Sequence, residues 1–111
     1  MTRQRLEYHQ IIREHLSKAY LLPEEKIETV LPRFLESLQG LILDVERVAG
    51  TESREDLGRV GHTMKGALLN LGLKELAAIA IVLEQTSRTA DLEQDCAQVI
   101  AELKKEISKF V

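Results

Sequence analysis

Several residue types are scarce in this chain, and each scarcity excludes something. The 111 residues include one cysteine, Cys96, two prolines and six glycines, and only 4% are aromatic. A single cysteine excludes an intrachain disulfide and a cysteine zinc cage, so a reduced, cytoplasmic setting is expected. No apolar run approaches the roughly 20 residues of a membrane span. The segment from Met1 to Gln10 is polar and mixed in charge, so no signal peptide is expected.

An excess of one charge sign is also missing. The chain carries 15 basic and 18 acidic residues, for a net charge of −3. That balance gives no electrostatic footprint for nucleic acid or for an acidic membrane surface. The length suits one domain over residues 1–111. So short a chain rarely builds a deep substrate cleft, which weakens the case for a self-sufficient enzyme.

The residues that do dominate are strong helix formers, namely Ala, Leu, Glu, Lys, Arg and Gln, and alternating apolar and polar stretches are missing. We therefore expect an all-α fold. The predicted helices run over about residues 3–20, 23–49, 51–72, 73–88 and 91–111. Short connections favour antiparallel neighbours, hence an up-and-down four-helix bundle over residues 27–111 with an additional N-terminal helix within residues 1–25.

Local signals mark several helix ends. Pro23 suits the first turn of the second helix, and Gly50 suits its end. Pro32 lies inside that helix and predicts a kink or a split near Val30–Leu31. The third helix opens at Thr51 or Ser53. A capping box is expected there, because Asp56 stands three residues after Ser53.

The third helix carries the most informative pattern. At about 100° per residue its apolar positions form one stripe, and His62 lies about 160° from the centre of that stripe, pointing away from the core. The stripe consists of Leu57, Val60, Met64, Ala67, Leu68 and Leu71. The residues that flank His62 on its own face, three or four positions away, are Gly58, Arg59, Lys65 and Gly66.

Three of the six glycines, Gly58, Gly61 and Gly66, fall in this one helix. Glycine in a helix interior costs about 0.5–1 kcal/mol relative to alanine, so stability does not explain them. Bare backbone beside an exposed histidine indicates that another surface comes close. Leu69, seven residues after His62, is apolar on the same exposed face and is expected to be a docking anchor.

These residue types suit phosphoryl chemistry. An imidazole is a nucleophile at neutral pH and forms covalent phosphoryl adducts. The Lys65 ammonium would stabilise charge on the transferring group. In the fourth helix Glu84 falls at the edge of the apolar stripe formed by Leu73, Leu76, Ala77, Ala80, Leu83 and Ser87. A carboxylate there needs a partner, and pairing across to His62 would fix the imidazole tautomer.

The segment Gly61-His62-Thr63-Met64-Lys65-Gly66-Ala67 resembles the A-H-x-L-K-G-small pattern of histidine-containing phosphotransfer (HPt) domains. The family glycine ten residues after the histidine is present as Gly72. Leu83-Glu84 and then Arg88 follow in the next helix, and the resemblance covers about Ile27 to Val111. Gly61 stands where alanine is usual. The position of Glu84 often holds glutamine, and Glu84 is similar to the histidine-contacting glutamate of chemotaxis-type kinases; a one-residue shift would put Gln85 in its place.

The resemblance implies a function. His62 would accept a phosphoryl group from the aspartate of a response-regulator receiver domain and pass it to a second receiver in a bacterial-type phosphorelay fed by a sensor or hybrid histidine kinase. The receiver would dock over Gly58, Arg59, Gly66 and Leu69 and would supply Mg²⁺. The chain itself, a monomeric phosphocarrier, would hold no cofactor, metal or nucleotide.

Two other functions stay open. One is a helical interaction module that binds a partner without carrying phosphate. The other is the phospho-accepting input domain of a chemotaxis-type histidine kinase, which Glu84 favours. A metal or haem bundle is disfavoured because no carboxylate and histidine set faces the core. His9 and His15, six residues apart, are expected on the surface, and Cys96 in the core. Ile79, Ile81 and Val82 either belong to the same apolar patch as Leu69 or pack on the N-terminal helix, and the second is expected.

Overall fold

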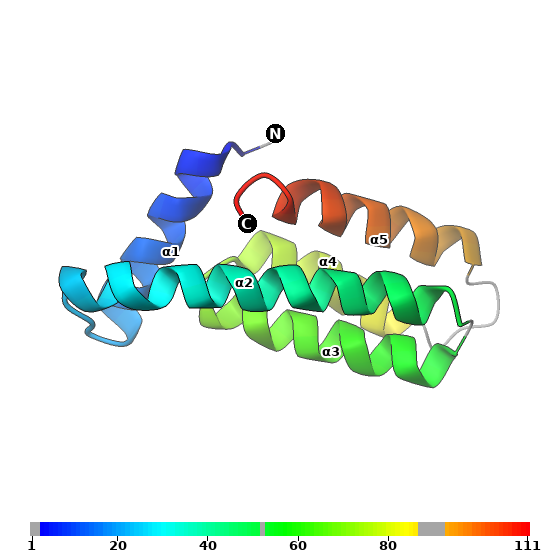
Figure 1. Cartoon of the computed structure of the whole chain (residues 1–111). Helices are drawn as coiled ribbons and strands as arrows, with labels where there is room; N and C mark the ends of the chain where they lie inside the picture. The colour runs from blue at the N-terminus through cyan, green and yellow to red at the C-terminus, as the bar shows by residue number, and fades with distance from the viewer. Residues whose placement is uncertain (1–2, 52, 87–92) are drawn as a thin grey trace.

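The computed structural model describes residues 3–51, 53–86 and 93–111 (Figure 1). Within these ranges all regular structure is helical, which confirms the predicted all-α class. The helices are α1 (Arg5–Ala19), α2 (Glu24–Ala49), α3 (Arg54–Asn70), α4 (Lys74–Thr86) and α5 (Glu93–Ile107). Among the described helices none is long and apolar enough to cross a membrane.

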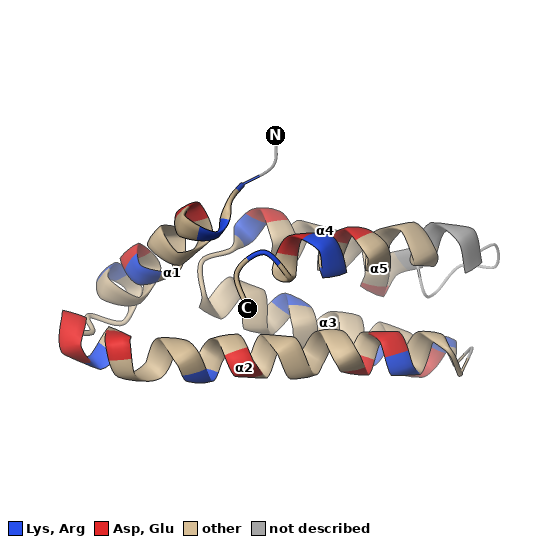
Figure 2. Cartoon of the chain, turned by 45° about the horizontal axis from the view of Figure 1, so that its top comes forward, with Lys and Arg blue, Asp and Glu red and all other residues tan. Residues whose placement is uncertain are grey.

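Helices α2 to α5 form the predicted up-and-down bundle. Helix α3 packs against α2 and α4, and α5 packs against α4 and α2. Helix α1 packs on α2 and lies across the end of the bundle where the chain's C-terminus is found (Figure 1). Lysine and arginine are interspersed with acidic residues along the helices (Figure 2), in keeping with the near-neutral composition.

The interior is apolar and follows the predicted helical spacing. In α3, Leu57, Met64 and Leu68 are buried, and Val60 and Ala67 are partly buried. The predicted α4 stripe is buried from Leu73 to Leu83, whereas Ser87 lies outside the described residues. The buried residues near the C-terminus are Cys96, Leu103, Ile107 and Phe110. Because the α3 stripe faces this core, the opposite side of α3 is left at the surface.

The two prolines behave differently from expectation. Pro23 is the N-cap of α2 rather than a residue of its first turn, and its carbonyl accepts the amides of Lys26 and Ile27, each at 3.0 Å. Pro32 lies inside α2, but the predicted split near Val30–Leu31 is wrong, because the helix continues through it (Figure 1). Proline deprives the Glu28 carbonyl of its amide partner, and Pro32 is exposed, so water can hydrate that carbonyl.

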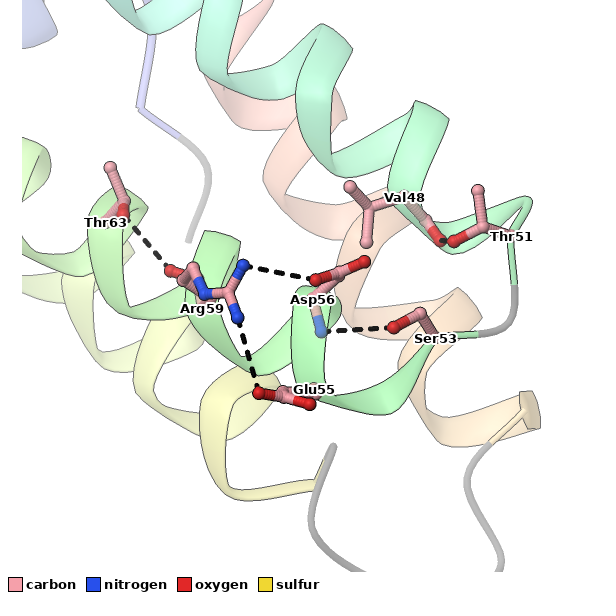
Figure 3. A network of polar contacts seen from close by, with 7 residues as sticks. All are labelled: Val48, Thr51, Ser53, Glu55, Asp56, Arg59 and Thr63. Atoms are coloured by element: carbon pink, nitrogen blue, oxygen red, sulfur yellow. Dashed lines mark hydrogen bonds and ion pairs between the residues drawn. The ribbon is translucent and has the colours of Figure 1, made fainter.

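The sequence predicted that α2 ends at Gly50 and that α3 opens at Thr51 or Ser53, and the connection between the two helices confirms both. Gly50 ends α2, although its φ of −70° makes no use of glycine's conformational freedom. Ser53 caps α3, and its Oγ accepts the amide of Asp56 at 3.3 Å (Figure 3). The Thr51 hydroxyl instead turns back and donates to the Val48 carbonyl at 2.7 Å.

The turn between α3 and α4 decides how these helices meet. The amide of Leu73 donates to the Leu68 carbonyl at 2.9 Å, and that of Gly72 donates to the Leu69 carbonyl at 3.0 Å. With Gly72 at φ +77°, this is a Schellman ending, in which glycine takes the left-handed position. The turn sends α4 back along α3.

Helix α1 contributes to the core through the buried residues Tyr8, Ile12 and Leu16. The surface placement predicted for His9 and His15 is wrong. Both are partly buried because α1 packs across the bundle end. His9 Nε2 donates to the Phe110 carbonyl at 2.9 Å. The His15 ring lies so close to Gly72 that a Cβ on that glycine would be 2.6 Å from it.

The outer face of α4 does not meet α1. Val82 was predicted to pack on the N-terminal helix, but its side chain is 45% exposed. The reason is the position of α1, which crosses the bundle near the start of α4, whereas Val82 lies toward the other end of that helix (Figure 1). Ile79 instead packs against the core.

Candidate functional site

His62 lies midway along α3 with 66% of its side chain exposed. Gly61, one position before His62, and Met64, two positions after it, face the core and are buried. The stripe that buries them also fixes the rotation of α3 about its axis, so the imidazole projects from the bundle surface. An exposed ring of this kind is accessible to a reaction partner.

Glu84 lies beside this imidazole. Its Oε2 is 3.2 Å and its Oε1 3.4 Å from His62 Nδ1. The Glu84 side chain is only 16% exposed, since it stands at the edge of the core stripe of α4. A proton on Nδ1 donates to this carboxylate, which leaves the lone pair on Nε2. The pair therefore favours the tautomer in which Nε2 carries the free lone pair.

Lys65 completes a three-residue cluster with His62 and Glu84. Its Nζ is 3.4 Å from Glu84 Oε2, and a quarter of its side chain is exposed. Burial alone would raise the pKa of Glu84, but the hydrogen bond from His62 and the charge of Lys65 outweigh it and hold the pKa below its ordinary 4.5. The carboxylate is thus ionised at neutral pH.

The glycines around His62 differ in what approaches them. A Cβ on Gly61 would lie 3.2 Å from the Glu84 amide nitrogen, so the surface that comes close to Gly61 is α4 of the same chain. This close packing brings Glu84 within reach of His62. A Cβ on Gly66 would meet nothing within 4 Å, so the space over Gly66 is open to a partner. Gly58 is partly buried.

The other predicted docking residues are at the surface. The Arg59 guanidinium lies 3.2 Å from Asp56 Oδ1 and 3.4 Å from Glu55 Oε1 (Figure 3), which orders it one turn before His62. Leu69 is 44% exposed. These positions form a continuous strip along α3 on the side of His62.

The structure brings Glu84, and not the alternative Gln85, to the imidazole. Gln85 is exposed, because one residue further along α4 points about 100° away. Arg88 lies outside the described residues. In the described ranges no group of three His, Cys, Asp or Glu side chains could hold a metal ion.

Sequence reasoning missed one contact in the site, the ion pair between Lys65 and Glu84. Lys65 was expected to face an incoming phosphoryl group, and its tie to Glu84 depends on how closely α3 and α4 pack. The signal that could have indicated this approach is Gly61, which takes the place of a larger residue at the contact.

One family model matches most of the chain. The family model described as the Hpt domain matches residues 29–110. The searches of curated proteins and of solved structures gave no significant match. The matched range covers α3, α4 and the whole cluster around His62, and the chain therefore belongs to the Hpt domain family, whose members carry out phosphotransfer in two-component signalling with response regulators and histidine kinases.

Proposed function

We propose that the chain is a phosphocarrier that takes a phosphoryl group from the aspartate of one receiver domain and delivers it to a second. The observation that carries the proposal is the exposed His62 with Glu84 at 3.2 Å from its Nδ1. This arrangement presents Nε2 as a nucleophile toward solvent while a fixed carboxylate holds the opposite nitrogen.

The transfer step balances without an added reactant. His62 Nε2 attacks the phosphorus of the receiver's aspartyl phosphate, the bond from phosphorus to the aspartate oxygen breaks, and the electron pair returns to the aspartate carboxylate. The Nδ1 proton stays in its hydrogen bond to Glu84, which stabilises the positive charge that develops on the ring. The reverse reaction with a second receiver restores the free imidazole. The receiver supplies Mg²⁺ and the aspartate pocket.

Lys65 has a second role in this proposal. Its ammonium is held near the ring by Glu84, within reach of a group arriving at His62. Lysine acts as a mobile point charge on phosphate, so Lys65 would stabilise the equatorial oxygens of the transferring phosphoryl group. Its loss should slow transfer without abolishing it.

The test is phosphorylation by a panel of phosphorylated receiver domains. The wild-type chain should gain a label that is labile to acid and stable to base. The label should be absent from His62→Gln and retained in the matched control His9→Gln. No label on the wild type, with the protein shown to be folded, would contradict the proposal.

A second function is favoured by one feature, the glutamate rather than glutamine at the ring. The chain would then be the input domain of a chemotaxis-type kinase, phosphorylated from ATP by a separate catalytic domain. Labelling by a kinase core with ATP, but by no receiver, would favour this alternative. Unchanged partner regulation by His62→Gln would instead favour a pure interaction module.

A further inference from the structure

The connection between α1 and α2 carries two exposed apolar residues that the family match does not include. Tyr20 is 50% and Leu21 is 83% exposed, and both precede the matched range of 29–110. A single exposed leucine needs no explanation. The backbone at this position, however, makes this leucine unusual.

Leu21 adopts a φ of +54°, and among the described non-glycine residues it is the one with a positive φ. The left-handed region is unfavourable for leucine and readily adopted by glycine and asparagine. At the end of α3 the same problem is solved by Gly72 at φ +77°. Neither burial nor backbone preference accounts for leucine at position 21, so its side chain is better explained by a contact outside the chain.

This connection joins the face of α3 that carries His62. The Tyr20 hydroxyl donates to Asn70 Oδ1 at 3.3 Å, and the His15 ring contacts Tyr20 edge to face at 5.8 Å. His62, Gly66, Leu69 and Asn70 follow the i, i+4, i+7, i+8 spacing of one helix face. At 1.5 Å per residue, Asn70 is about 12 Å along the axis from His62.

A docked receiver would reach that far. A standard protein interface covers about 800 Å² on each partner, and a disc of that area has a radius of about 16 Å. A footprint centred on His62 therefore includes Asn70, to which the Tyr20 hydroxyl is bonded at the margin of that disc. On the way it crosses Leu69, which is 44% exposed, and Gly66, over which there is open space.

We propose that Tyr20 and Leu21 extend the docking face, so that the receiver that reaches His62 also buries Leu21 and the Tyr20 ring against its own apolar surface. The inference rests on the proposed function. It assigns the N-terminal helix a role in partner recognition, because α1 holds Tyr20 through His15 and sets the position of the connection.

The test compares two exposed leucines of the N-terminal region. Leu21→Asn removes the apolar side chain and keeps a residue that tolerates a positive φ, so its thermal unfolding should match or exceed that of the wild type. Leu6→Asn is the control, because Leu6 is 81% exposed in the first turn of α1. The measurement is the steady-state rate of phosphoryl transfer from a phosphorylated receiver at varied concentrations, with a second receiver present to discharge His62 so that the chain turns over.

Leu21→Asn should raise KM about tenfold, the size expected for one leucine no longer buried, with kcat unchanged. Leu6→Asn should transfer like the wild type. A wild-type KM in Leu21→Asn, or an equal rise in both variants, would overturn the docking extension and leave the phosphocarrier function standing. Absence of transfer to the wild type from every receiver would overturn both.

Discussion

Two clusters in this molecule are built from the same parts, an aromatic ring, a glutamate and a lysine. At the first, His62 Nδ1 lies 3.2 Å and Lys65 Nζ 3.4 Å from Glu84 Oε2. At the second, the Tyr8 hydroxyl donates to Glu106 Oε1 at 2.7 Å, and Lys109 Nζ lies 2.7 Å from Glu106 Oε2. The composition is shared, but the surroundings differ.

Burial of the ring separates them. Tyr8 is 4% exposed and its ring packs against Phe110, with centroids 4.5 Å apart. Burial and the Glu106 carboxylate raise the pKa of Tyr8 far above its usual range, so its hydroxyl stays protonated and serves only as a donor. The His62 side chain is 66% exposed. A ring, a carboxylate and an ammonium therefore make a structural tie when the ring is enclosed, and leave the ring accessible to a reaction partner when it faces solvent.

The Tyr8 cluster joins α1 to the C-terminal end of the bundle, which gives the largest stability effect that the comparison predicts. Tyr8→Phe keeps the ring and removes the donor to the buried Glu106. A lost hydrogen bond to a charged group should lower the free energy of unfolding by about 2 kcal/mol, as measured by urea denaturation. Transfer to His62 should be unchanged. A large loss of transfer would contradict the separation of the two clusters.

In the exposed cluster, loss of the carboxylate should slow phosphoryl transfer more than it lowers stability. Glu84→Gln removes the negative charge that holds Nδ1–H and Lys65. Transfer should slow roughly tenfold, the lower end of what loss of a carboxylate behind a histidine costs at metal sites. The urea midpoint should fall less than in Tyr8→Phe, because the His62 ring that Glu84 holds is 66% exposed. Transfer at the wild-type rate would show that Glu84 does not position the ring.

Acid should weaken the buried cluster, with a smaller effect on stability than Tyr8→Phe. Burial works to raise the pKa of Glu106, but hydrogen bonds from Lys109 and Tyr8 outweigh it and hold the pKa below its ordinary 4.5. A lowered pKa stabilises the fold above 4.5, and that contribution is lost as the pH falls through the folded-state value. Glu106→Gln should therefore be less stable than the wild type at pH 7, and the gap should narrow below pH 4.5. A gap independent of pH in urea titrations would contradict this assignment.

Much of the fold could be predicted, because helix formers and the three/four spacing of apolar residues are local properties. The stripe from Leu57 to Leu71 placed His62 at the surface, and the structure agrees. The split predicted at Pro32 did not occur, because the cost of an interior proline depends on whether its unmatched carbonyl reaches water. His9 and His15 were misplaced because their burial comes from the packing of α1 across the bundle end, over contacts up to 101 residues apart.

The sequence by itself determined the helical class, the face on which His62 stands and the residue types beside it on α3, since these depend on residue type and on the turn of one helix. Only the tertiary structure decided that Glu84 rather than Gln85 meets the ring, that Lys65 pairs with that same carboxylate, and that Tyr20 reaches Asn70. Those contacts join separate helices, and a shift of one residue or of about 1.5 Å along a helix axis would change the partner.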